Sequence, residues 1–195
     1  PSEVLIIADE TANPEYCAAD LLAQAEHDPL ASVILITTSP PLADAVNSEV
    51  TQQIKSLSRR AIAAESLNRG FIVVVENVDK AIELANLYAP EHLCLMVENA
   101  AAYLDRVSSA GCIFVGGNST VVLGDYVAGP SHVLPTGGTA RFNSPLNVTD
   151  FTKFINTITV DKAALKKLGK AASAMARAEG LDGHARAIEK RLQVD

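Results

Sequence analysis

Acidic side chains and histidines that are neighbours in the sequence are the first candidates for chemistry. Glu91 and His92 follow Pro90, where a predicted helix gives way to a predicted strand at the mouth of an α/β sheet. A carboxylate and an imidazole have different pKa values, so the pair suits stepwise acid-base chemistry. The alternative is a pair of exposed polar residues at the start of a strand.

Four polar residues spread along the chain are candidates for a metal site. Gln24 and His27 are three residues apart near the C-terminal end of a predicted helix, so both side chains point to one face. Asp125 begins a glycine-rich loop and could supply a carboxylate oxygen, and His184 would complete a four-ligand set. Imidazole suits zinc, whereas a glutamine oxygen is an unusual zinc ligand. The alternatives are a polar helix rim, a turn aspartate and a helix-surface histidine, because no compact H-E-x-x-H or paired C-x-x-C motif is present.

Two familiar fingerprints are missing from the sequence. No G-x-G-x-x-G follows a predicted strand, so the ordinary Rossmann nucleotide motif is absent. No G-x-S-x-G nucleophile elbow accompanies the serines, histidines and aspartates that a hydrolase triad would need.

Predicted strands and helices alternate over the first two-thirds of the chain. The strands are expected at 3–8, 32–37, 70–76, 93–97 and 112–115, and the helices at 14–27, 41–67, 78–88 and 100–107. Apolar strands that alternate with helices predict an α/β fold with a mostly parallel sheet covered on both faces. We expect an incomplete Rossmann-like layer followed by a helical C-terminal tail.

The character of the sequence changes after Gly116. Residues 116–145 contain six glycines and three prolines with little periodicity, and such long loops usually carry function. Helical patterns follow near 149, over 162–178 and over 181–192. We therefore predict an α/β domain at 1–146, which carries most of the candidate site, and a helical tail at 147–195. The tail is too small to fold alone and should pack on this domain or on a second subunit.

Composition excludes several classes of partner. The 195 residues include 16 basic and 23 acidic side chains, a net charge of −7, without a Lys/Arg run that could follow phosphates, so nucleic acid is not expected. The longest apolar runs are strand-sized, so no membrane segment is expected. The three scattered cysteines fit a reduced cytosol. Because the chain opens on Pro1 and enters an apolar strand almost at once, we expect a segment of a longer protein.

Several segments together resemble the C-terminal half of histidinol dehydrogenases. They are residues 2–9, 20–28, 88–93, 124–126 and 132–136, in family-like order, and the resemblance runs over essentially the whole chain. It implies a cytoplasmic, homodimeric, zinc-dependent enzyme of histidine biosynthesis. In such enzymes L-histidinol is oxidised to L-histidine in two successive NAD-dependent steps through an aldehyde.

The resemblance also implies roles for individual residues. Glu91 and His92 would be the catalytic acid-base pair. The implied zinc ligands are Gln24, His27, Asp125 and His184. The implied substrate-binding residues are Ser2, Gln24, His27, His92, Asp125, His132, Glu179 and His184. In the family, the tail that bears Glu179 and His184 reaches into the neighbouring subunit's site.

The sequence departs from the family in two ways. The loop at 116–123 lacks the Pro-Glu dipeptide often found there. The family's upstream half, which is expected to hold most NAD contacts, does not match any part of this chain. We therefore expect the chain alone to bind zinc weakly or not at all and to be inactive. The alternatives are a non-catalytic binding or dimerisation fragment and a zinc hydrolase of a small amide or ester.

Overall fold

The computed structural model describes residues 2–193 and comprises two compact units, Pro1–Phe151 and Thr152–Asp195. The predicted boundary, between residues 146 and 147, lies slightly earlier in the sequence. The two units are described separately.

The first unit is built on a parallel sheet of five strands. They are β1 (Glu3–Ala8), β2 (Ser32–Thr37), β3 (Phe71–Val74), β4 (His92–Met96) and β5 (Cys112–Val115), in the order β3-β2-β1-β4-β5. Every neighbouring pair is parallel. The predicted α/β class and parallel sheet are therefore confirmed.

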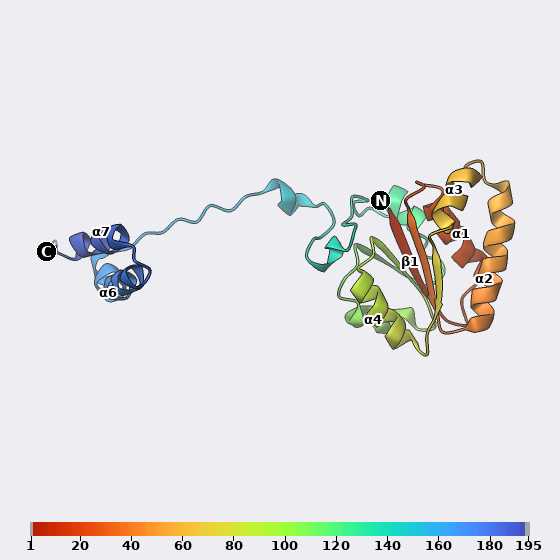
Figure 1. Ribbon diagram of the computed structural model, residues 1–195, viewed down its shortest axis with the longest axis horizontal. Helices are drawn as coiled ribbons and strands as arrows, with labels where there is room; N and C mark the ends of the chain where they lie inside the picture. Colours follow the sequence, from red (N-terminus) through yellow and green to blue (C-terminus); the bar gives the residue numbers. More distant parts are fainter. Residues whose placement is uncertain (1, 194–195) are drawn as a thin grey trace. The chain divides into compact units, whose positions relative to one another are not determined.

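Helices cover both faces of this sheet, because the side chains of the central strands are apolar on both sides. On one face lie α1 (Pro14–Ala25), α2 (Pro40–Gln53) and α3 (Arg60–Leu67), and on the other α4 (Val78–Tyr88) and the 3₁₀ helix η2 (Ala100–Arg106) (Figure 1). Val4 and Ile6 of β1 face the first group, and Leu5 and Ile7 face the second. All four side chains are buried, which makes β1 the centre of the core.

The predicted helix at 41–67 is interrupted in the structure. It forms α2, the 3₁₀ turn η1 (Ile54–Ser56) and α3. Leu57 lies between them with an extended backbone, ψ 133°, and packs against the core on the α1 side of the sheet. Packing of this partly buried side chain against the core outweighs continued helical hydrogen bonding, and periodicity alone does not reveal such a break.

The glycine-rich stretch also contains more structure than the sequence indicates. Residues Val121–Tyr126 form the short helix α5, so Asp125 lies on a helix and the expectation of a loop or turn aspartate is wrong. The 3₁₀ turns η3 (Thr139–Arg141) and η4 (Val148–Phe151) follow.

The second unit is a pair of helices, α6 (Lys162–Ala178) and α7 (Asp182–Leu192), packed on each other. Gly169 allows their close approach, since a Cβ there would lie 3.0 Å from a methyl of Leu192. The two helices are also joined by an ion pair between Arg177 and Glu189, 2.8 Å apart. In the described part of the chain, no helix has both the length and the apolar character needed to cross a membrane.

Candidate functional site

A cavity of ≈ 930 Å³ in the first unit gathers every predicted site residue of that unit. Its lining includes Ser2, Gln24, His27, Glu91, His92, Asp125 and His132. Ser2 precedes β1 and His92 is the first residue of β4, so the cavity lies at the amino-terminal edge of the sheet. Ligands of open parallel sheets usually bind beyond the carboxyl ends of the strands. In this sheet, Glu91 and His92 instead lie at the amino-terminal ends of the strands, which is the opposite edge.

The carboxylate of Glu91 is held by two donors from the start of the chain. Ser2 Oγ donates to Glu91 Oε2 at 2.8 Å, and the backbone N–H of Glu3 donates to the same oxygen at 2.9 Å. Gln24 Nε2 in turn donates to Ser2 Oγ. The other oxygen, Glu91 Oε1, accepts no hydrogen bond from the described residues, and Glu91 lines the cavity. One oxygen is thus fixed and the other is available for proton transfer.

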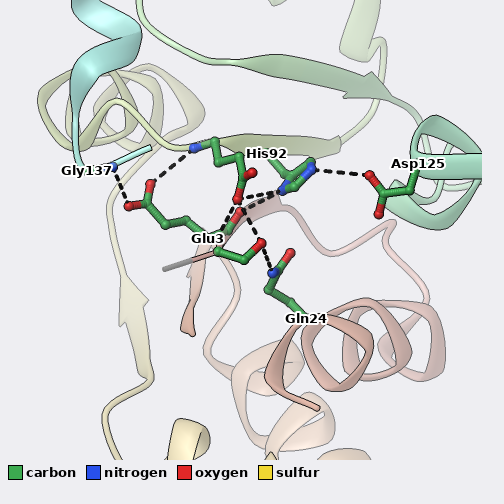
Figure 2. A network of polar contacts seen from close by, with 7 residues as sticks. Glu3, Gln24, His92, Asp125 and Gly137 are labelled. Carbon is green, nitrogen blue, oxygen red and sulfur yellow. Dashed lines mark hydrogen bonds and ion pairs between the residues drawn. The ribbon is translucent and has the colours of Figure 1, made fainter. Parts of the chain in front are cut away.

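The tautomer of His92 follows from its contacts. Nδ1 lies 2.9 Å from the backbone carbonyl oxygen of Glu3, and a carbonyl can only accept, so Nδ1 carries the proton. In the neutral ring, Nε2 then bears a lone pair. Nε2 is buried without a hydrogen-bond partner in the described residues. Its nearest acidic neighbour is Asp125 Oδ1, at 3.7 Å (Figure 2).

Two acceptors that face each other at this distance call for a donor between them. Neither the lone pair of Nε2 nor an ionised Asp125 carboxylate can donate a hydrogen bond. A ligand hydroxyl, an ammonium group or a cation would satisfy both atoms. Unpartnered buried polar atoms are rare and need such an explanation.

Local backbone geometry places Glu91 and His92 at this edge. Helix α4 ends with Ala89 in the left-handed conformation, φ 57°, and Pro90 prevents further helix. Gly111 passes directly over the following peptide: a Cβ at this position would lie 2.6 Å from the carbonyl oxygen of Glu91. That oxygen also accepts from Cys112 N at 2.9 Å, so the close approach is part of the strand pairing.

Helix α1 supplies Gln24 and the turn that follows it supplies His27. The helix ends at Ala25, so His27 lies just beyond it and not on its face as the spacing predicts. His27 N donates to Gln24 O at 3.2 Å, which keeps both residues on the cavity wall. Gln24 is buried and His27 is exposed.

A partly buried hydrogen bond joins α1 to the residue before α5, and the sequence does not predict it. Asp20 on α1 accepts from Thr120 Oγ1 at 2.6 Å, and Thr120 is the residue before α5, which carries Asp125. Burial raises the pKa of Asp20, and the hydrogen bond from Thr120 acts in the opposite direction. The only sequence signal for this contact is an acidic residue between Ala18 and Leu21, on an otherwise apolar face.

The remaining predicted residues lie elsewhere. Glu179 and His184 belong to the second unit and are exposed. Within residues 2–193, no three His, Cys, Asp or Glu side chains form a group that could hold a metal ion. The cavity nevertheless offers an amide, an imidazole and a carboxylate from Gln24, His27 and Asp125, a nitrogen and oxygen donor set compatible with zinc.

Comparison with known proteins gives a consistent result. A model of the family described as "Histidinol dehydrogenase" matches residues 1–192. The chain is 59% identical to a histidinol dehydrogenase of Dehalococcoides mccartyi (strain CBDB1) over 99% of its own length and 44% of that protein. It is 53% identical to a histidinol dehydrogenase of Halalkalibacterium halodurans, over 99% of the chain and 46% of the relative.

A solved structure supports the same relationship. The crystal structure of histidinol dehydrogenase from Elizabethkingia anophelis superposes with a TM-score of 0.89 at 43% sequence identity, covering 99% of this chain and 45% of that one. The chain thus spans less than half the length of the relatives it matches. From its sequence and its fold alike, the chain belongs to the histidinol dehydrogenase family.

Proposed function

We propose that this chain carries the acid-base and substrate-binding part of a histidinol dehydrogenase, which oxidises L-histidinol to L-histidine through the aldehyde. The observation that carries the proposal is the bare Nε2 of His92, buried beside Glu91 and 3.7 Å from Asp125 in a cavity large enough for an amino alcohol. We assign the enzyme to the cytoplasm and to histidine biosynthesis on the strength of the family.

His92 is the proton acceptor of the first oxidation. NAD⁺ would supply the hydride acceptor for both oxidations of the carbinol carbon. As the hydride leaves, the hydroxyl proton of the substrate passes to Nε2. Nδ1–H continues to donate its hydrogen bond to the carbonyl oxygen of Glu3. The product of this step is the aldehyde, and the imidazolium that forms is stabilised by Asp125 and Glu91.

Glu91 is the base for the second oxidation. Its Oε1 takes a proton from water as the water oxygen bonds to the aldehyde carbon, and the His92 imidazolium gives its Nε2 proton to the former carbonyl oxygen, which yields the hydrate and a neutral His92. Loss of a second hydride and of one of the two hydroxyl protons, which passes to the neutral His92, leaves the carboxylic acid. Glu91 Oε2 stays held by Ser2 and Glu3, so the carboxylate keeps its orientation throughout.

Gln24, His27 and Asp125 are the zinc ligands of this unit, and His184 of the second unit completes the set. Zinc, when bound, polarises the substrate and orients its carbinol carbon. Ser2, His132 and Glu179 bind the substrate in this proposal. We further propose that the protein is a homodimer in which residues 147–195 reach the partner's cavity, and that NAD is held mainly by a part of the enzyme that this chain lacks.

The test compares the chain alone with a joined protein. The joined protein contains this chain together with the part of the D. mccartyi relative that lies outside the match. With zinc, NAD⁺ and L-histidinol, the joined protein should form two NADH per histidine and the chain alone should form none. A His92→Asn variant of the joined protein should lose activity, and the matched His132→Asn variant should mainly raise KM.

Three outcomes would overturn the proposal in different ways. NADH formed by the chain alone would refute the requirement for the missing part. A folded, inactive joined protein would favour a non-catalytic binding fragment. Hydrolysis of a small amide or ester without NAD⁺ would favour the zinc hydrolase.

A further inference from the structure

Glu3 and Glu91 form a reciprocal pair at the start of two neighbouring strands. The β1–β4 register begins with Val4 opposite His92, so these two glutamates lie one residue outside the ladder. The N–H of Glu3 donates to Glu91 Oε2 at 2.9 Å, and the N–H of Glu91 donates to Glu3 Oε2 at 3.2 Å. Each carboxylate thus binds the other residue's backbone amide and extends the pairing of the strands beyond the ladder.

The second carboxylate oxygen of Glu3 holds a distant loop. Gly137 N donates to Glu3 Oε1 at 2.8 Å, and Gly137 adopts φ 62°, a conformation that favours glycine (Figure 2). This turn lies five residues after His132, on the same loop. Both oxygens of Glu3 therefore accept a backbone N–H, and the residue is 5% exposed.

The backbone of Glu3 contacts both members of the acid-base pair. Its N–H fixes Glu91 Oε2, and its carbonyl sets the tautomer of His92 through Nδ1. Glu3 itself does not line the cavity. Displacement of this one residue would therefore disturb the orientation of the carboxylate and the ring together.

We propose that Glu3 is a positioning residue for Glu91 and His92, and this inference rests on the proposed function. Its carboxylate binds the backbone of Glu91 and the turn at Gly137 to the start of β1. The Glu3 backbone can therefore hold the side chains of Glu91 and His92 in their orientations. Two amide donors converge on this carboxylate, which suits two acceptor oxygens. A glutamine at this position would turn an NH₂ group toward one of the donors, and an aspartate would be one methylene too short for both.

The unmodified chain provides the first test. In the protein labelled with ¹³C and ¹⁵N, scalar couplings across hydrogen bonds should connect the Glu3 side-chain carboxyl carbon with the amide nitrogens of Glu91 and Gly137. The ¹⁵N shifts of His92 should report the Nδ1–H tautomer. A folded chain without these couplings, or with the proton of His92 on Nε2, overturns the inference whatever the enzyme does.

Kinetics of the joined protein provide the second test. Glu3→Gln should lower kcat on the order of 10²-fold while KM for L-histidinol stays within about twofold, because misplaced catalytic groups slow the chemical step. The ¹⁵N shifts of His92 should move toward a mixture of tautomers. Glu3→Asp should lower kcat in the same way although it keeps the charge.

The matched control is Glu10→Gln, an exposed glutamate just beyond the other end of β1. This variant should leave kcat and the His92 spectrum unchanged. A folded Glu3 variant with unaltered kcat would overturn the positioning role. Should both Glu3 variants fail to fold, the hydrogen-bond couplings and the His92 tautomer in the unmodified chain decide whether the positioning role holds. Inactivity of the unsubstituted joined protein would instead count against the proposed function.

Discussion

The hydrogen bond between Thr120 and Asp20 should contribute more to the free energy of unfolding than a hydrogen bond on the surface does. The variant Thr120→Val tests this. Valine has nearly the same shape as threonine but cannot donate, so the buried carboxylate of Asp20 loses the partner that lies 2.6 Å away. A hydrogen bond to a charged group contributes about 1.5–3 kcal/mol. We expect the free energy of unfolding of the first unit to fall by this amount at neutral pH.

The loss should depend on pH because of the state of Asp20. Burial raises the pKa of Asp20 in the folded chain above its ordinary value of 3.8. The folded state therefore binds more protons than the unfolded state between the two pKa values, and stability falls as the pH rises through that interval. Thr120→Val removes the contact that lowers this pKa, so the fall becomes larger. At a pH below both pKa values the variant should lose only about 1 kcal/mol, as for a neutral hydrogen bond.

Tyrosine fluorescence can follow the first unit alone during urea unfolding. The chain has no tryptophan, and its tyrosines, Tyr16, Tyr88, Tyr103 and Tyr126, all precede the second unit. The matched control is Thr51→Val, since this exposed hydroxyl donates only to the carbonyl of Asn47 on its own helix. The control should cost less than about 0.5 kcal/mol.

A double-mutant cycle completes the design. In an Asp20→Asn background, where no buried charge remains, Thr120→Val should cost clearly less than in the unsubstituted chain. An equal cost in both backgrounds would refute the role of the charge. A cost no larger than that of Thr51→Val would refute the hydrogen bond itself.

Three further predictions concern packing, cysteine chemistry and metal. Gly111→Ala should destabilise the first unit by about 1–3 kcal/mol, because its Cβ would lie 2.6 Å from the backbone oxygen of Glu91 and force a shift; urea unfolding measures this, and a neutral result would contradict the close approach. Burial raises the pKa of Cys17 to about 12 and that of Cys94 well above its usual value, so both should resist iodoacetamide at about pH 8 while the half-buried Cys112 reacts first. Mass spectrometry of digests gives the order, and faster labelling of Cys94 than of Cys112 would be inconsistent with this core. Dialysis of the joined protein against a chelator should abolish NADH formation and added zinc should restore it; activity that persists in metal-free protein would argue against the ligand set.

Much of the fold could be predicted because the three central strands, β2, β1 and β4, are buried on both faces. Continuous apolar runs such as 33–36 identify strands of a parallel sheet without any knowledge of their order. The break at Leu57 could not be predicted, since it depends on which side chain reaches the core. The 3₁₀ geometry of η2 was likewise hidden, because its spacing of apolar residues resembles that of an α-helix.

The residues of the candidate site could be predicted from the sequence, but the residues that hold them in place could not. Glu91 and His92 attract notice because they are adjacent, whereas Glu3 resembles an ordinary charged residue at a strand start. Its importance depends on the register that sets Val4 opposite His92, and register between strands far apart in sequence cannot be read from periodicity. Asp20 was missed for the same reason, since its partner Thr120 lies a hundred residues away.

His92 belongs to β4, which has a neighbouring strand on each side, while Asp125 and His132 come from the glycine-rich stretch that borders the cavity. The proposed proton acceptor is therefore on a strand that is hydrogen-bonded on both sides, whereas His132 lies on a loop, where sequence changes are more easily tolerated. Because these residues lie on different segments, evolution can change which ligand the cavity binds without changing the environment of His92. Engineering for altered amino alcohols should accordingly begin at His132 and leave the strand and the proposed zinc ligand Asp125 untouched.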